Sequence, residues 1–463
     1  MRTQWTAVLA TGALVAGVLL VTAPVRADRP QLPQAAGERL RGLSTKDLAR
    51  LEPHLAAGPV ALIEFANTDK DRLPAINIAT YVNAPVPAIV DVIGRPEHYP
   101  SFIGTADEVN VVARERDTVV YDWNWGMAIF QMEGRNVMRT YLPAAAQASR
   151  GARITIDSQS GDMGKGRTSI RVLPRDLPAT AQRSARARSL LVLSMRVDLR
   201  DANYVARKLS QAARSINRSA NISLAYSLLL GYQAQAERRS GKRAAARVDA
   251  GFARPQINLR ALYPLLRRGD LLMLELERGA LRQVAVVGGI GKRPEVVREI
   301  LLDAHGFGRS LLPGSEATVV SQQGPTTVFD WDIDLPLIGV SGRMRMDERP
   351  DEIAVQATGG ALAGGRWSFA VEPLGKRGSV VTSWARFDLK RSSWWLKQLV
   401  DDDPVLGHGI SAASEVMLMR ALRSRSRKVD KHGKPLPAAA APKVKRKRVR
   451  LKAHRRHSAR FGR

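Results

Sequence analysis

The sequence has no cysteine among its 463 residues. This absence excludes disulfides, iron–sulfur clusters, thiolate zinc sites and cysteine nucleophiles. Histidine is scarce as well, with seven residues, three of which lie in the basic C-terminal segment. The other four, His54, His98, His305 and His408, lie in unrelated segments and form no recognisable triad.

Long apolar runs are absent except near the N-terminus. Residues 6–23 are uncharged, and Val25-Arg26-Ala27 places small residues at the right spacing before Asp28. The pattern predicts a signal peptide over residues 1–27. An uncleaved membrane anchor is the alternative, because a run of this length could just span a bilayer. We expect an exported bacterial protein, periplasmic or secreted.

Acidic residues are few relative to basic ones, with 43 Asp and Glu against 72 Lys and Arg, a net charge of +29. Residues 423–463 carry 17 Lys and Arg and one Asp, a net +16, which leaves +13 for the rest (29 − 16). Segment 424–463 is predicted to be a disordered basic tail. After export its expected partner is an anionic membrane surface or an envelope polymer. Nucleic acid is unlikely for an exported chain, and a solvated tail without a partner is the alternative.

The chain contains an internal repeat. The pairs Asp122-Trp123 and Gly134-Arg135 recur 208 residues later as Asp330-Trp331 and Gly342-Arg343. Three other segments recur in the same order: Gly161–Ser169 with Gly360–Ser368, Leu48–Glu64 with Leu259–Glu275, and Pro87–Ile93 with Pro294–Ile300. The repeat predicts two copies of one domain, over residues 45–237 and 258–423, joined by a linker at 238–257.

The hydrophobic periodicity within a copy indicates an α+β fold. A strand at Ile76–Val82 precedes a short helix beginning near Val86, and successive strands and hairpins follow. Each copy ends in a long helix, predicted from Ala202 to about Glu237 in the first. We expect two tandem helix-grip domains, each a curved antiparallel sheet with a long C-terminal helix against its concave face.

One segment carries a family resemblance. Residues Ala79–Ile103, "ATYVNAPVPAIVDVIGRPEHYPSFI", resemble the opening of START-related domains, a superfamily that includes coenzyme-Q-binding and polyketide-cyclase-like proteins. Tyr99, Pro100 and Phe102 match its Tyr-Pro-x-Phe pattern, whereas the second copy lacks the Tyr-Pro. The resemblance implies a helix-grip fold that holds an apolar molecule between sheet and helix. Some members catalyse, but no universal catalytic residue exists to carry over.

Two matching strands, "YDWNWGM" (Tyr121–Met127) and "FDWDIDL" (Phe329–Leu335), separate polar from bulky side chains. Asp330, Asp332 and Asp334 share one face, where the first copy has Asp122, Asn124 and Gly126. Successive carboxylates on that face lie about 6.6 Å apart, too far to share one ion unaided. We therefore predict a solvent-facing surface and no metal site.

The opposite strand face is predicted to line a core or an apolar cavity. The predicted ligand-binding set combines this face with residues of the long helices and one further strand: Trp123, Trp125, Met127, Leu209, Ile216, Trp331, Ile333, Trp367, Phe369 and Val416. Arg135, Arg343, Arg167 and Arg366 also recur between the copies, and either hold a ligand carboxylate or headgroup or flank turns in solvent. No cofactor is predicted, because Gly289-x-Gly291 fails the dinucleotide pattern at Pro294.

Three functions fit these observations. The leading one is an exported binding or transfer protein for an apolar ligand, such as a lipid, an isoprenoid or a polyketide-like molecule. The first alternative is a cyclase- or dehydratase-like enzyme of the same fold, with His98 and Glu97 at the cavity mouth. The second alternative is an envelope scaffold whose cavities are collapsed. Cavity volume and the surroundings of His98 separate these possibilities.

Overall fold

The structure is a computed structural model. It describes residues 40, 42–55, 57–64, 75–127, 130–144, 151–162, 164, 166–175, 188–197, 214–241, 251–277, 280–308, 315–335, 338–376, 378–386, 397, 401 and 404–429. The predicted signal peptide and nearly all of the basic tail lie outside these residues.

The first half of the described chain begins with a helix, continues with eight strands and ends in a long helix. Its elements are α1 (Thr45–Leu55), β1 (Val60–Glu64), β2 (Ile76–Val82), α2 (Val86–Gly94), η1 (Pro96–Ser101), β3 (Ala106–Glu115), β4 (Thr118–Met127), β5 (Phe130–Tyr141), β6 (Ala152–Gly161), β7 (Arg167–Arg175), β8 (Arg188–Arg196) and α4 (Arg214–Arg239). Pro87 at the start of α2 supplies the backbone angle that a first helical turn needs.

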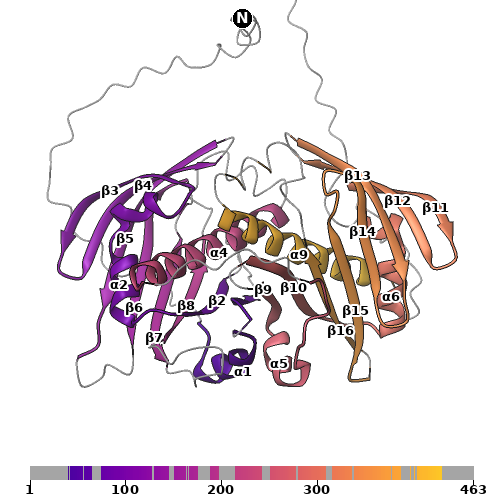
Figure 1. Ribbon diagram of the computed structural model, residues 1–463, viewed down its shortest axis with the longest axis horizontal. Helices are drawn as coiled ribbons and strands as arrows, with labels where there is room; N and C mark the ends of the chain where they lie inside the picture. The colour runs from indigo at the N-terminus through magenta and orange to yellow at the C-terminus, as the bar shows by residue number, and fades with distance from the viewer. Residues whose placement is uncertain are drawn as a thin grey trace, which may run out of the picture. The chain divides into compact units, whose positions relative to one another are not determined.

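The second half repeats this order (Figure 1). Its elements are α5 (Leu259–Leu266), β9 (Gly269–Glu277), β10 (Ala280–Ile290), α6 (Pro294–Leu302), α7 (Ala304–Gly308), β11 (Ser315–Gln323), β12 (Thr326–Leu335), β13 (Ile338–Glu348), β14 (Ile353–Gly360), β15 (Arg366–Leu374), β16 (Gly378–Arg386) and α9 (Pro404–Ser426). The internal repeat of the sequence is thus a repeat of structure.

The strands that the structure describes form one antiparallel sheet of 16 strands, in the order β11-β12-β13-β14-β15-β16-β10-β9-β1-β2-β8-β7-β6-β5-β4-β3. The two halves meet where β1 pairs with β9. Ala61 lies opposite Leu272 there, and these two residues are equivalents in the repeat. The register is therefore symmetric about this pair. Joining the two sheets is a feature that the sequence reasoning did not predict.

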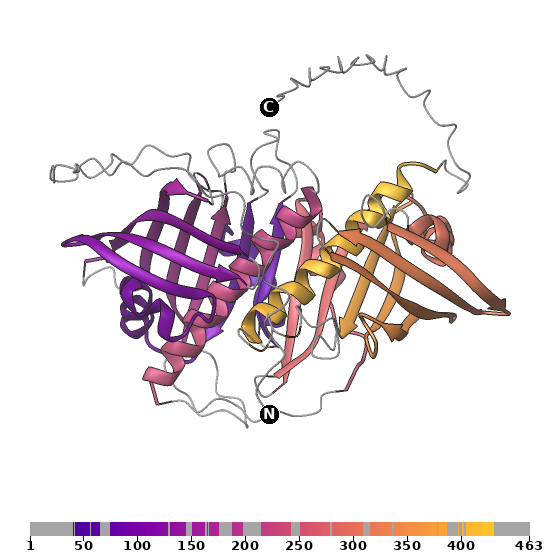
Figure 2. The same cartoon turned by 90° about the horizontal axis from the view of Figure 1, so that it is seen from above.

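The long helices α4 and α9 cover one face of the sheet and lie against each other (Figures 1 and 2). Helix α4 packs on β2 and β8, and α9 packs on β9, β10 and β16. At Gly409 the two helix backbones come so close that a Cβ atom would lie 2.5 Å from the Cα of Ser223. A glycine permits this approach because it carries no side chain.

Two layers of apolar side chains cover the sheet. Under α4 and α9 lies the larger core, which includes Ile78, Leu193, Val286 and Val381. On the opposite face, α1 and α5 cover a smaller core around Leu51, Leu265 and Trp384. Alternate residues of one strand enter different cores, as the two-residue period of a strand requires: Val381 enters the first core and Val380 the second.

The predicted helix-grip architecture is confirmed in both halves. Helix α4 is described from Arg214, so the predicted residues 202–213 of this helix lie outside the part of the chain that the structure describes. Among the described residues, no helix is long and apolar enough to cross a membrane.

Candidate functional site

The first half has a cavity between its sheet and α4. It is about 80 Å³ in volume and mainly apolar, and it is lined by Tyr99, Tyr121, Trp123, Trp125, Asn136, Ile156, Ser158, Gly166, Arg167, Thr168, Met195, Arg196, Val197, Leu224, Leu228 and Tyr232. Small-molecule pockets are usually about 300–1,000 Å³. This space therefore accommodates only a small group unless the lining moves.

An aromatic cluster closes one side of this cavity. The Tyr99 ring lies 5.5 Å from Tyr232, 5.7 Å from Phe102 and 6.4 Å from Tyr121, measured between ring centroids. Tyr99 is fixed in place because its hydroxyl donates to the Ile93 carbonyl oxygen at 2.7 Å. Burial raises the pKa of Tyr232 to about 12, so all these phenols stay protonated near neutral pH. Tyr99 and Phe102 belong to the sequence pattern that carried the family resemblance.

The two tryptophans of β4 form a further part of the cavity wall. The rings of Trp123 and Trp125 lie 5.1 Å apart. With its amide oxygen turned inward, Asn136 accepts from Trp123 Nε1 at 3.2 Å and from the Tyr121 hydroxyl at 3.1 Å. The Trp125 Nε1 atom is buried and has no hydrogen-bond partner in the described part of the chain. The wall thus offers one free N–H donor to a ligand.

Charged groups border the cavity at β6 and β7. Arg167, which lines it, donates to Asp157, and Arg139 lies 3.5 Å from the same carboxylate. All three side chains are mostly buried. In the second half Arg366, the equivalent of Arg167, is exposed and lies opposite Gln356 instead of an aspartate. Of these two equivalent arginines, Arg167 is placed to contact a ligand in the cavity, whereas Arg366 is exposed.

In the second half, the predicted ligand-binding residues whose side chains are described belong to the core. Trp331, Trp367, Phe369 and Val416 are all buried in the core under α9. Met344 takes the position that Asn136 has in the first half, and Trp331 Nε1 has no hydrogen-bond partner among the described residues.

The side chains of the remaining predicted ligand-binding residues lie outside the described part of the chain. Leu209 lies outside the described residues. Met127, Ile216 and Ile333 belong to β4, α4 and β12, but their side chains lie outside the described part. Their predicted contact with a ligand stays a prediction.

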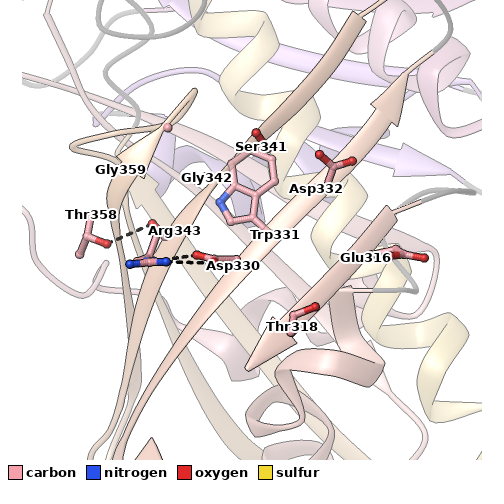
Figure 3. A pocket seen from close by; sticks show the side chains of 11 residues that line it. Glu316, Thr318, Asp330, Trp331, Asp332, Ser341, Gly342, Arg343, Thr358 and Gly359 are labelled. Atoms are coloured by element: carbon pink, nitrogen blue, oxygen red, sulfur yellow. Dashed lines mark hydrogen bonds and ion pairs between the residues drawn. The ribbon is translucent and has the colours of Figure 1, made fainter. Parts of the chain in front are cut away.

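The polar face of the same strands forms two matching open grooves on the sheet. The groove in the second half measures about 650 Å³ and includes Asp330, Asp332 and Arg343 (Figure 3), and the one in the first measures about 400 Å³ and includes Asp122 and Arg135. Asp122, Asp330 and Asp332 are thus open to solvent as predicted, and the Asp334 side chain lies outside the described part of the chain.

An arginine neutralises one acid in each groove. Arg343 Nε and Nη2 donate to the two carboxylate oxygens of Asp330 at 2.7 and 3.0 Å, and Arg135 contacts Asp122 at 2.6 and 2.8 Å. The hydrogen bonds from Arg343 lower the pKa of Asp330. Sequence reasoning treated the arginines and aspartates separately, although their fixed spacing in both copies was the signal for a pair.

The candidate catalytic residues at the mouth have other partners. Glu97 accepts two hydrogen bonds from Arg114 Nη2 at 2.8 and 2.9 Å, and His98 Nδ1 lies 3.2 Å from Arg239 Nη2. Both contacts are on the exposed surface, and neither residue lines the cavity. Among the described residues, no group of three acidic or histidine side chains could hold a metal ion.

No protein-family model and no curated protein matches the sequence. Three similar solved structures are the di-domain ARO/CYC StfQ from the steffimycin biosynthetic pathway, TTHA0849 from Thermus thermophilus, and the STAR-related lipid transfer protein from Xanthomonas axonopodis. StfQ is 12% identical over 76% of this chain and 98% of its own, with a TM-score of 0.24. TTHA0849 is 17% identical over 36% and 99%, and the Xanthomonas protein 15% over 34% and 93%, each with a TM-score of 0.26. The assignment of the helix-grip architecture rests on the strand order and helix placement given above.

Proposed function

We propose that this chain is a binding or transfer protein for an apolar ligand, which the first half holds between its sheet and α4. The observation that carries the proposal is the cavity walled by Trp123, Trp125, Tyr121 and Tyr232. Aromatic walls exclude water and bury apolar ligand surface, and each Å² removed from water contributes about 25 cal/mol. The free Trp125 Nε1 donor supplies one point of orientation.

A ligand of lipid size requires α4 to move away from the sheet. The C-terminal end of α4 is tethered by polar contacts that such a movement would break. Gln233 Nε2 donates to the Tyr81 carbonyl oxygen at 3.1 Å, Glu237 accepts from the Asn83 amide at 3.0 Å, and Arg239 pairs with Asp91 at 2.6 Å. The two hydrogen bonds are half-buried and typically contribute about 0.5–1.5 kcal/mol each, and the exposed ion pair contributes at most about 1 kcal/mol. Ligand burial can offset their loss.

Export and membrane attachment are part of the proposal. Residues 1–27 would direct the chain out of the cytoplasm, and the basic tail would hold it at an anionic membrane surface or envelope polymer. Sequence composition supports both statements.

The test is to isolate the full chain from its producing cell without detergent and to extract bound apolar molecules for mass spectrometry. A bound apolar molecule is expected for the native chain and is expected to be lost in Trp125→Ala. Tyr263→Ala removes an exposed aromatic residue on α5 and serves as the control. Absence of any apolar molecule, together with no quenching of tryptophan fluorescence by added lipids, would overturn the proposal.

The small cavity volume favours a second candidate, the non-binding envelope scaffold. In that case the space of about 80 Å³ stays closed, and its aromatic residues serve only as core. The two functions differ in one measurement. Added apolar ligand raises the melting temperature of a binding protein, because it stabilises the folded state alone, and leaves that of a scaffold unchanged.

A further inference from the structure

The second half has a carboxylic acid at the centre of its core. Glu415 lies on α9 with no solvent-exposed surface, between the buried neighbours Ser411, Val416 and Met419 of the same helix. Ser383 of β16 faces it from the sheet and is 1% exposed. Val381 and Ala385, which share the Ser383 face of β16, are core residues. The acid and the hydroxyl are thus enclosed by apolar groups.

Neither polar group is satisfied within the described structure. Both carboxyl oxygens of Glu415 and the hydroxyl oxygen of Ser383 are buried without a hydrogen-bond partner of acceptable geometry. Leaving a buried polar group unpaired costs about 1–3 kcal/mol, and more for a charged one. A leucine at each position would avoid this cost, so packing alone does not account for the two residues.

The positions in the first half that correspond to this region carry apolar side chains. Phe369 pairs with Ser383 in the sheet, and the equivalent Ile170 pairs with Leu193, so Ser383 takes the place of a leucine. The described side chains that α4 buries include Ala225 and Leu229, and none of them is acidic. Among the described residues, the buried acid and the hydroxyl facing it are therefore features of the second half alone.

The charged groups around α9 have other partners. Asp270 of β9 pairs with Arg423, Asp303 after α6 pairs with Arg425, and Lys292 donates to the Val429 carbonyl oxygen at 2.8 Å. These contacts lie toward the C-terminal end of α9. Among the described residues, further titratable groups are His408 and Arg420 on α9, Arg427 directly after it, and Tyr226 on α4. Among the described residues, burial raises the pKa of Glu415 and the Ser383 hydroxyl opposes this rise.

We propose that Glu415 and Ser383 form a polar contact site inside the second half, at which a neutral apolar molecule is held by a carbonyl oxygen. The protonated carboxyl of Glu415 donates one hydrogen bond to that oxygen, and the Ser383 hydroxyl donates a second. The site rests on the proposed function, because it requires an apolar molecule to enter between sheet and helix. It extends that function by naming the ligand group and by assigning the second half a site of its own.

The surroundings favour a neutral ligand over an anionic one. Burial raises the pKa of Glu415 to about 8, so that the acid is protonated and able to donate at neutral pH. A carboxylate or phosphate ligand would have to be desolvated with no cation among the described residues beside Glu415. A ketone, quinone or ester oxygen requires only donors.

The test compares a long-chain methyl ketone with the alkane of equal length, using native mass spectrometry of the full chain near pH 6.5 and near pH 9.5. At the lower pH we expect the ketone to bind the native chain at least about fivefold more tightly than the alkane, which is the contribution of one good hydrogen bond. Above the pKa the carboxylate cannot donate, so this preference should shrink. Glu415→Gln retains a donor and should keep the preference at both pH values. Glu415→Leu and Ser383→Ala should reduce it, and the surface variant Glu316→Gln should behave as the native chain does.

The outcomes separate the two proposals. If alkane and ketone both bind the native chain but Glu415→Leu and Glu415→Gln leave the ketone preference and its pH dependence unchanged, the Glu415 site is overturned and the proposed function stands. If neither probe binds the native chain, both proposals fall. A ketone preference that disappears in Glu415→Leu and becomes independent of pH in Glu415→Gln supports the site.

Discussion

The buried carboxyl of Glu415 predicts an unusual pH dependence of folding stability. In the unfolded chain this group titrates near its ordinary pKa of 4.5, whereas burial raises its pKa to about 8 in the folded chain. The folded state therefore holds the proton more tightly than the unfolded state does. Below pH 4.5 the acid is protonated in both states, and it places no ionisation cost on folding.

The cost appears as the pH rises between these two values. Each pH step of one then removes about 1.4 kcal/mol from the free energy of unfolding. Between pH 4.5 and pH 7 the free energy of unfolding therefore falls by about 3 kcal/mol. Between pH 4.5 and pH 8 it falls by about 5 kcal/mol. These are large fractions of the 5–15 kcal/mol that stabilises a typical domain. Above pH 8 the contribution is constant.

The assay is urea denaturation of the native chain and of Glu415→Gln from pH 4.5 to pH 9, followed by far-UV circular dichroism. The glutamine variant has no proton to lose, so the difference between the two free energies of unfolding should grow by several kcal/mol in its favour across this range. Glu316→Gln, which removes an exposed carboxyl, is the control. A difference that stays constant to within about 1 kcal/mol would show that Glu415 is hydrated or paired, and would refute the reasoning.

Three further predictions concern packing and hydrogen bonding, each measured by denaturation. Gly409→Ala should destabilise the chain by about 1–2 kcal/mol, because the clash with Ser223 outweighs the helix-propensity gain of about 1 kcal/mol. The control Gly94→Ala should not destabilise the chain, because its Cβ would meet nothing within 4 Å. Asn136→Met should lower the free energy of unfolding by about 1–3 kcal/mol, because Trp123 Nε1 and the Tyr121 hydroxyl lose their acceptor. The reverse change at the equivalent position, Met344→Asn, should be better tolerated, because it offers an acceptor to Trp331 Nε1. Asp122→Asn and Asp330→Asn should each leave the free energy of unfolding nearly unchanged, because these ion pairs are exposed. A clear loss of stability would contradict the open character of the grooves.

The secondary structure was largely predictable because local patterns determine it. The alternation in Tyr121–Met127 identified β4 and its buried face, and the apolar run after Pro87 identified α2. Strands β1 and β9 were not predicted because most of each strand is an unbroken apolar run, over Val60–Ile63 and Leu271–Leu274. Both faces of these strands are covered, so no polar face exists to reveal the period.

The candidate sites were less predictable, since they depend on pairings between distant segments. Glu415 lies in an apolar helix and looks like an ordinary interruption of the stripe until Ser383 appears opposite it. Tyr232 reaches Tyr99 only because α4 folds back over the sheet. The cavity volume was not predictable from the sequence either, because it depends on how closely these side chains pack and not on their types alone.

The symmetric register about Ala61 and Leu272 has a consequence for each half alone. A half separated from its partner would expose an apolar strand edge at β1 or β9, with its backbone donors and acceptors unmatched. Because the two strands meet through equivalent residues, two identical halves can form the same contact with each other. Either half produced by itself is thus expected to form a two-fold symmetric dimer, so that the covalent chain behaves as a dimer whose two subunits have been joined and allowed to differ.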